Sequence, residues 1–316
     1  MTRVAVLDDY QGAAARHPSW ATLDAEVVFF ADHVPDADAL VARLRGFEVV
    51  MAMRERSAFP REVLERLPEL KLLVTTGPRN AAIDVAAANE LGIVVCGTGY
   101  VMASTAELTW ALILAAVRHL PAEHAAVRTG GWQQRVGGDL AGGILGVIGL
   151  GNLGAYVARI GTAFGMRVIA WSQNLTPERC AEVGAELVTR EELLASADVV
   201  TIHLVLSDRT RGLIGAAELA SMKPGAVLVN TSRGPIVDEA ALIVALTEGR
   251  IAGAGLDVYD TEPLPAGHPL RHLPNLVTTP HIGYVTEKMY DVFFRESAEN
   301  VAAYLAGQPI RVIEQS

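Results

Sequence analysis

Three glycines, Gly149, Gly151 and Gly154, lie between a short apolar run, 144–148, and a segment with helical spacing, 155–160. In a strand–turn–helix unit the first glycine of G-x-G-x-x-G permits the turn, and the second lets a pyrophosphate approach the backbone. The third lets the helix pack close to the strand, and the free N–H groups of the first helical turn attract phosphates. The spacing and its flanking segments therefore predict a dinucleotide-binding site.

Three further side chains that could do chemistry each follow a strand-like run: Arg233 after 226–230, Glu262 after 251–256 and His281 after 276–278. Parallel strands end at one edge of a sheet, and open α/β sheets bind ligands at that edge. We therefore expect a guanidinium, a carboxylate and an imidazole to emerge together, a set suited to binding an anion and moving a proton.

The elements that must position these groups alternate between strand-like and helical patterns along the chain. In the first hundred residues the expected strands are 4–7, 27–30, 47–51, 72–75 and 93–96, and the expected helices are 36–44, 60–67 and 84–91. This alternation predicts an α/β unit with a parallel sheet, and the unit has no glycine fingerprint of its own.

A long helix is expected over 104–120, ended by Pro121. A second α/β unit follows, with expected strands at 144–148, 167–171, 186–188, 199–203, 226–230, 251–256 and 276–278, and then a helix over 287–305. The strand-like tail 311–313 finds no partner in the second unit, so we expect it to return to the first. The cofactor domain, 102–286, is thus an insertion in a domain made of 1–101 and 287–316.

Composition narrows the classes of protein. The chain has 316 residues, 51% of them hydrophobic and 20% charged, which is typical of a globular protein of about two domains. A net charge of −10 without a basic run argues against a nucleic-acid partner, and the longest apolar stretch is too short to span a membrane. Cys96 and Cys180 lack the spacing of metal ligands or of a disulfide framework, which favours a cytoplasmic protein without a metal site.

The second anchor of the dinucleotide departs from the usual pattern. An Asp or Glu about 20 residues after the glycines normally binds the ribose 2′-hydroxyl of NAD and disfavours a 2′-phosphate. Here the expected strand 167–171 is followed by Ser172 and Gln173, and no arginine is adjacent, since Arg179 lies seven residues past Ser172. We therefore predict relaxed cofactor selectivity, with NAD or NADP accepted. The alternative is an NAD enzyme that lacks this contact.

Four motifs in this order resemble the D-isomer-specific 2-hydroxyacid dehydrogenase family over essentially the full length. They are the glycine turn, Asn-Thr-Ser-Arg-Gly at 230–234, Gly-Leu-Asp-Val followed by Glu-Pro at 255–263, and Pro-His-Ile-Gly at 280–283. The family includes glyoxylate/hydroxypyruvate reductases and D-lactate and phosphoglycerate dehydrogenases. The resemblance implies a Rossmann-type domain inserted into a flavodoxin-like α/β substrate domain.

The same resemblance implies roles for the three chemical groups. Arg233 would hold the carboxylate and carbonyl of a small 2-oxo acid, for which a planar two-pronged donor is suited. His281 would be the general acid/base, giving its proton to the carbonyl oxygen as hydride arrives from the nicotinamide. Glu262 would hydrogen-bond the imidazole and favour its protonated form.

For the cofactor, the resemblance implies that Asp257 takes the nicotinamide carboxamide and that backbone around Asn152 and Leu153 meets the pyrophosphate. It also implies that the rest of the cofactor cleft is lined by Thr105, His203 and Thr231. A structural role for His203 is equally compatible with the sequence.

Two departures concern the substrate. Arg79 stands near where the family usually has glycine, so Arg79 or Asn80 is expected to add a contact to a polar or dianionic substrate, unless Arg79 points to solvent. Tyr284 stands where the family favours a small residue, and we expect it to narrow the pocket.

These features predict a cytoplasmic homodimeric oxidoreductase that interconverts small D-2-hydroxy acids and 2-oxo acids. Two alternatives remain at this point: an NADH-sensing binding protein of the same fold, and an enzyme that oxidises another small anion such as formate or phosphite.

Overall fold

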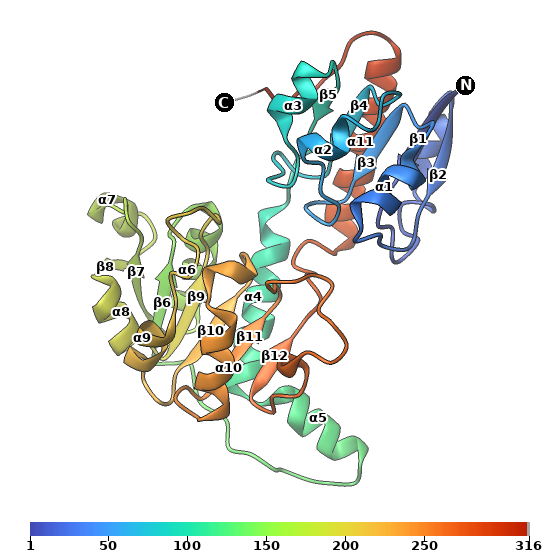
Figure 1. The fold of residues 1–316 in the computed structure, drawn as a ribbon. Coiled ribbons are helices and arrows are strands. Elements are labelled where there is room, and N and C mark those ends of the chain that lie inside the picture. Colours follow the sequence, from blue (N-terminus) through green and yellow to red (C-terminus); the bar gives the residue numbers. More distant parts are fainter. Residues whose placement is uncertain (315–316) are drawn as a thin grey trace. The chain divides into compact units, whose positions relative to one another are not determined.

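The computed structural model describes residues 1–314, which divide into two compact units, 1–101 with 285–314 and 102–284. We call them unit 1 and unit 2 (Figure 1). The boundary after Tyr284 lies two residues before the expected one.

Unit 1 contains, in its described residues, a five-stranded parallel sheet with the strand order β2-β1-β3-β4-β5. This is the flavodoxin-like order, and it confirms the expected fold class. The strands are β1 (Thr2–Val6), β2 (Ala25–Phe29), β3 (Val49–Ala52), β4 (Leu72–Thr75) and β5 (Val94–Cys96); the helices are η1 (Pro18–Thr22), α1 (Ala37–Leu44), α2 (Arg61–Leu64), α3 (Val85–Glu90) and α11 (Glu287–Leu305).

Both faces of this sheet are buried, which explains why its strands are continuous apolar runs. Consecutive residues of β1 point to opposite faces: Val4 packs toward Val301 of α11, whereas Ala5 packs with the cluster that contains Leu40 of α1. The C-terminal tail returns to this unit as expected, because Val312 pairs with Cys96 at the edge of β5.

Unit 2 contains, within the described chain, a seven-stranded parallel sheet with the order β12-β11-β10-β9-β6-β7-β8. Counted from β6 this is 3-2-1-4-5-6 extended by one strand, the doubly wound dinucleotide-binding order. The strands are β6 (Ile144–Ile148), β7 (Arg167–Trp171), β8 (Glu186–Leu187), β9 (Val199–Ile202), β10 (Val227–Asn230), β11 (Gly253–Leu256) and β12 (Leu276–Thr278).

Helices cover the two faces of this sheet (Figure 1). On one face α4 and α6 supply Trp110, Ile113 and Val157, and on the other α8 and α10 supply Leu193 and Leu242. The helices are α4 (Met102–Val117), α5 (Leu120–Arg128), α6 (Asn152–Ala163), α7 (Pro177–Ala181), α8 (Arg190–Ser196), α9 (Ala216–Ser221), α10 (Glu239–Thr247), η2 (Gly234–Ile236) and η3 (Pro269–Arg271).

Two expected helices have different limits. Pro121 does not end α4; the break comes at His119, which is left-handed (φ 52°), and Pro121 lies in the first turn of α5, where its missing N–H costs nothing. The helix expected over 60–67 is reduced to the single turn of α2, because the segment after Leu64 continues as turns.

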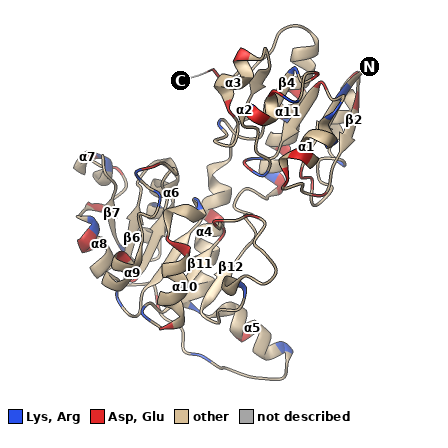
Figure 2. Ribbon diagram, in the orientation of Figure 1, with Lys and Arg blue, Asp and Glu red and all other residues tan. Residues whose placement is uncertain are grey.

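Among the described residues, no helix is both long enough and apolar enough to cross a membrane. Acidic and basic residues are interspersed over each unit (Figure 2).

Candidate functional site

The loops that follow β10, β11 and β12 carry the three chemical groups. These strands are parallel neighbours in the sheet, with Asn230 level with Leu256 and Leu256 level with Thr278. Their carboxyl ends therefore lie side by side, and Arg233, Glu262 and His281 follow at the same edge.

His281 and Glu262 form a direct pair. Nδ1 of His281 lies 2.6 Å from Oε2 of Glu262, and the imidazole side chain is 21% exposed. The other carboxylate oxygen of Glu262 accepts a hydrogen bond from the N–H of Tyr259 at 2.9 Å, which fixes the carboxylate. Because Nδ1 is committed to Glu262, Nε2 is the ring nitrogen that could exchange a proton with a ligand, an arrangement suited to a general acid/base.

Asp257 holds the loop on which His281 lies. Its carboxylate is buried and accepts hydrogen bonds from the hydroxyl of Thr279 and from the N–H groups of Ile282 and Gly283, at 2.6, 2.8 and 2.8 Å. Burial raises the pKa of Asp257 above its ordinary value, although these hydrogen bonds and the nearby His281 act in the opposite direction. The hydrogen bonds stabilise His281 in a left-handed backbone conformation (φ 54°) that non-glycine residues adopt rarely. A contact of Asp257 with the nicotinamide carboxamide stays a prediction.

Arg233 lies on a loop with a rigid backbone. Asn230 accepts from the N–H of Ser232 and donates to the carbonyl of Arg233, and the Ser232 hydroxyl donates to the carbonyl of Ile202. Gly234 packs so closely on the 257–262 loop that a Cβ would lie 2.1 Å from the Tyr259 carbonyl carbon. The half-buried side chain of Arg233 donates from Nη1 to the Ser232 carbonyl at 2.7 Å, and the backbone beside it packs on the loop that carries Glu262.

Two threonines of α4 connect these loops. The hydroxyl of Thr109 lies 2.8 Å from that of Thr231, and the hydroxyl of Thr105 donates to the carbonyl of Gly283 at 3.1 Å. Thr105 and Thr109 are one helical turn apart, so they share a face of α4. The buried hydroxyls of Thr105 and Thr231 therefore position the loops, and their contact with a cofactor stays a prediction.

The glycine turn fits a dinucleotide. Gly149 has φ +97°, and a Cβ on Gly154 would lie 2.0 Å from the Gly149 carbonyl oxygen, so both positions require glycine. A Cβ on Gly151 would meet no described atom within 4 Å, which leaves open space above the turn. Gly151 caps α6, whose first N–H groups, at Asn152 and Leu153, have no partner within the helix. The turn thus offers an open cradle of N–H groups for a pyrophosphate.

His203 lies behind the glycine turn. Its carbonyl would be 2.5 Å from a Cβ on Gly149, and its Nε2 is 3.0 Å from the hydroxyl of Thr201. Nδ1 is buried and has no hydrogen-bond partner among residues 1–314. Burial lowers the pKa of His203 to about 3, so the imidazole is neutral near pH 7.

The lowered pKa of this half-buried imidazole predicts a pH dependence of stability. An unfolded histidine titrates near 6.5, so between pH 6.5 and 3 the unfolded chain binds more protons and stability falls as pH falls. From pH 7.5 to 5 we expect the free energy of unfolding in urea to fall about 2 kcal/mol more for wild type than for His203→Gln. The exposed His124→Gln is the control. Equal pH slopes for wild type and His203→Gln would contradict the assignment.

The ribose end of the cradle has no carboxylate at the strand tip. Half-buried Ser172 and exposed Gln173 follow β7, as expected from the sequence. Arg179, distant in the sequence, returns to this region: its Nε donates to the carbonyl of Leu150 at 3.1 Å and its Nη2 to that of Gly151 at 3.3 Å. This contact is not predicted from the sequence, in which Arg179 lies seven residues past Ser172.

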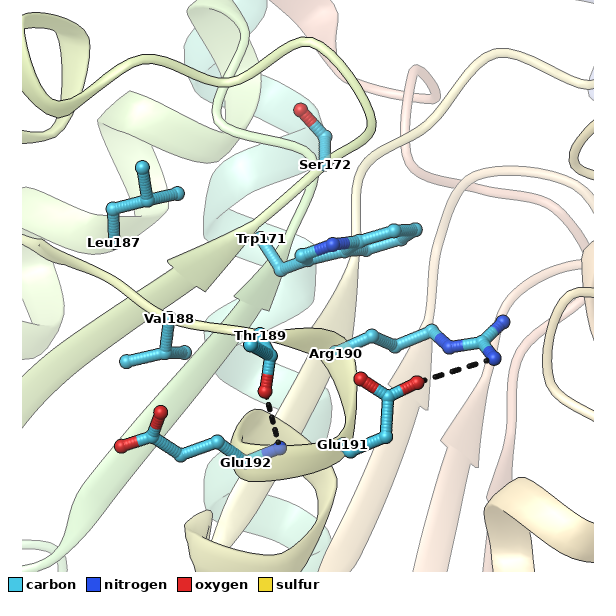
Figure 3. A pocket seen from close by; sticks show the side chains of 8 residues that line it. All are labelled: Trp171, Ser172, Leu187, Val188, Thr189, Arg190, Glu191 and Glu192. Carbon is cyan, nitrogen blue, oxygen red and sulfur yellow. Dashed lines mark hydrogen bonds and ion pairs between the residues drawn. The ribbon is translucent and has the colours of Figure 1, made fainter.

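Beside Ser172 lies an open cavity of about 690 Å³ (Figure 3). Its lining comes from the tip of β7, the end of β8 with the segment after it, and the first turn of α8: Trp171, Ser172, Leu187, Val188, Thr189, Arg190, Glu191 and Glu192. Arg190 lies near the Trp171 ring and pairs with Glu191 and Glu218 at 3.5 and 3.4 Å.

In unit 1, the two residues expected to contact a substrate, Asn80 and Arg79, differ in their exposure. Asn80 is buried, donates to the carbonyl of Arg54 and the hydroxyl of Thr75, and accepts from the N–H of Ala82. Its side chain therefore shapes the loop, and this geometry gives no support for a substrate contact. Arg79 is exposed, and its contact with substrate stays a prediction.

Tyr284 is buried against the His281–Glu262 pair. Its ring meets the His281 imidazole edge to face, with centroids 5.5 Å apart. In unit 2 the structure thus brings Arg233, Glu262 and His281 to one sheet edge, and the glycine turn to the same edge two strands away.

Comparison with known proteins gives this arrangement a family context. Residues 110–283 match the model of a family described as "D-isomer specific 2-hydroxyacid dehydrogenase, NAD binding domain". The chain is 42% identical over 257 residues to the glyoxylate reductase of Aeropyrum pernix, which covers 78% of this chain and 77% of that protein.

Two further relatives are similar over most of the chain. The D-3-phosphoglycerate dehydrogenase of Mycobacterium tuberculosis is 39% identical over 277 residues, 87% of this chain, and the chain spans 52% of that enzyme's length. The solved structure of a phosphoglycerate oxidoreductase from Vibrio cholerae has a TM-score of 0.92 and 36% identity, over 97% of this chain and 100% of that one.

Proposed function

Because the chain belongs to the D-isomer specific 2-hydroxyacid dehydrogenase family, an NAD-dependent oxidoreductase family, we propose that it interconverts small D-2-hydroxy acids and 2-oxo acids. The observation that carries this proposal is the His281–Glu262 pair, which shares its sheet edge with Arg233 and with the glycine cradle of the cofactor.

The nicotinamide, when bound, supplies or accepts the hydride. Arg233 binds the substrate carboxylate and orients the carbonyl with its planar guanidinium. His281 donates a proton from Nε2 to the carbonyl oxygen during reduction and takes it back during oxidation. Glu262 orients the imidazole through Nδ1 and offsets its positive charge while it is protonated. The carboxylate of Asp257 positions the loop that carries His281, and the N–H of Tyr259 positions the carboxylate of Glu262.

The test is the change in absorbance at 340 nm with NADH or NADPH against glyoxylate, hydroxypyruvate, pyruvate and longer 2-oxo acids. We expect turnover with at least one short 2-oxo acid. Tight cofactor binding without turnover on any of them would contradict the proposed activity and favour a sensing role or another small anion.

For the cofactor, we propose that NADP is accepted beside NAD. The support is the absence of a carboxylate at Ser172 and Gln173, the position that normally selects the free 2′-hydroxyl. NADP binding at least a hundredfold weaker than NAD would contradict this selectivity.

We further propose that unit 1 is the substrate domain and that the enzyme acts in the cytoplasm, where its two buried cysteines would stay unpaired.

Exposed apolar side chains on unit 2 support the proposed homodimer. Val127 of α5, Trp132 and Val136 are 56, 73 and 94% exposed, and they lie on one projecting segment (Figure 1). Such a surface is typical of an interface, and two identical copies bury it most simply around a two-fold axis.

The dimer predicts a specific loss on mutation. We expect the double variant Trp132→Ser, Val136→Ser to elute as a monomer in size-exclusion chromatography with light scattering, whereas wild type and Val244→Ser elute as dimers. Val244 is also exposed, but on α10. A monomeric wild-type protein would contradict the proposal.

A further inference from the structure

Arg179 extends from α7 to the glycine turn. Its guanidinium donates to the carbonyls of Leu150 and Gly151, at 3.1 and 3.3 Å, and its Nη1 pairs with Glu182. Since the carbonyl of Trp171 accepts from the N–H of Gly149 at 2.8 Å, the turn is tied to the tip of β7. The guanidinium therefore lies at the turn, next to the strand end where this fold binds the adenosine ribose.

The position expected for the ribose thus has a cationic group, the Arg179 guanidinium, beside it. Ser172 and Gln173 stand in place of the usual carboxylate, so neither of these two side chains repels a 2′-phosphate. An arginine has five N–H donors, and the three contacts of Arg179 leave donors for another anion. Among residues 1–314, Glu182 is the one acidic partner of Arg179. Its side chain is 58% exposed, and an exposed ion pair of this kind is weak enough to exchange for a pair with another anion.

The cavity on the other side of Ser172 is less suited to phosphate. Its single arginine, Arg190, is paired with Glu191 and Glu218, and the carboxylates of Glu191 and Glu192 line the same cavity (Figure 3). Like charges in one cavity disfavour a dianion. Of the two arginines near the ribose position, Arg179 is therefore the better phosphate ligand.

We propose that Arg179 determines the acceptance of the cofactor 2′-phosphate, and that Glu182 competes with this phosphate for the guanidinium. The inference rests on the proposed nicotinamide-dependent function, and it assigns cofactor specificity to a helix residue that follows the strand tip by seven positions.

Calorimetric binding of two adenosine fragments, 5′-AMP and 2′,5′-ADP, to the full chain separates the phosphate from the rest of the cofactor. We expect Arg179→Gln to weaken 2′,5′-ADP about tenfold more than 5′-AMP, the range for loss of one exposed charge-assisted hydrogen bond. Glu182→Gln should strengthen 2′,5′-ADP and leave 5′-AMP unchanged. The matched control is Arg167→Gln, which removes an equally Glu-paired arginine from the opposite end of β7.

Equal weakening of both fragments by Arg179→Gln would overturn the proposal, because Arg179 would then only shape the turn. A selective loss of 2′,5′-ADP in Arg190→Gln but not in Arg179→Gln would overturn it as well, since the phosphate would lie in the cavity. If wild type bound neither 5′-AMP nor NADH, the proposed function itself would fail, an outcome distinct from these two.

Discussion

Replacing His281 with alanine is expected to lower kcat for 2-oxo acid reduction by about 10²- to 10⁴-fold, the usual contribution of a positioned general acid. The imidazole is oriented by Glu262 at 2.6 Å and presents Nε2 to the ligand, so its removal takes away the proton donor. Steady-state kinetics measures the effect, and NADH fluorescence should show that cofactor binding remains.

The matched control is His268→Ala. His268 is also paired with a glutamate, Glu239 at 3.1 Å, but it caps η3 at the far end of the segment that follows β11. We expect its kcat to stay close to that of wild type. If His281→Ala retained wild-type kcat, the proton would have to come from another group and the assigned mechanism would be wrong.

Replacing Arg233 with lysine is expected to lower kcat/KM by roughly 10²- to 10³-fold, although the positive charge is kept. A planar guanidinium can bind a carboxylate and a carbonyl at once, whereas an ammonium is a point charge. The guanidinium also donates to the Ser232 carbonyl, but the hydrogen bonds of Asn230 with the backbone of Ser232 and Arg233 remain in this variant, so the fold should be retained.

The control for this substitution is the exposed Arg250→Lys, whose arginine pairs with Glu248. NADH affinity should be unchanged in both variants, since neither residue touches the glycine cradle. A kcat/KM for Arg233→Lys within about twofold of wild type would contradict the role of a two-pronged substrate ligand.

The sequence predicts the fold well because the signals are local. Apolar runs such as 144–148 and 226–230 are buried on both faces of a parallel sheet, and Gly149 and Gly154 lie where backbone sterics require glycine. Both sheet orders confirm the expected fold class. The error at Pro121 arises because proline both ends one helix and suits the first turn of the next.

The site is less predictable where it depends on contacts between distant segments. The hydrogen bonds of Asn80 to Arg54 and Thr75 exist only once β3 and β4 are adjacent, so its burial is not visible in the sequence. Likewise, Arg179 reaches Leu150 only because α7 folds back over the turn. The roles of Arg233, Glu262 and His281 are predicted from the order of the motifs. The structure adds the 2.6 Å contact between Glu262 and Nδ1 of His281, which orients the imidazole.

The most direct test of the central claim follows a label from the cofactor to the product. Pyruvate would be reduced with NADH deuterated at C4 of the nicotinamide, in the position that is transferred, and the lactate analysed by NMR and chiral chromatography. We expect deuterium at C2 of D-lactate, or at C2 of D-glycerate from hydroxypyruvate if pyruvate is a poor substrate. NADH oxidation that leaves C2 unlabelled, or a product of L configuration, would contradict the account.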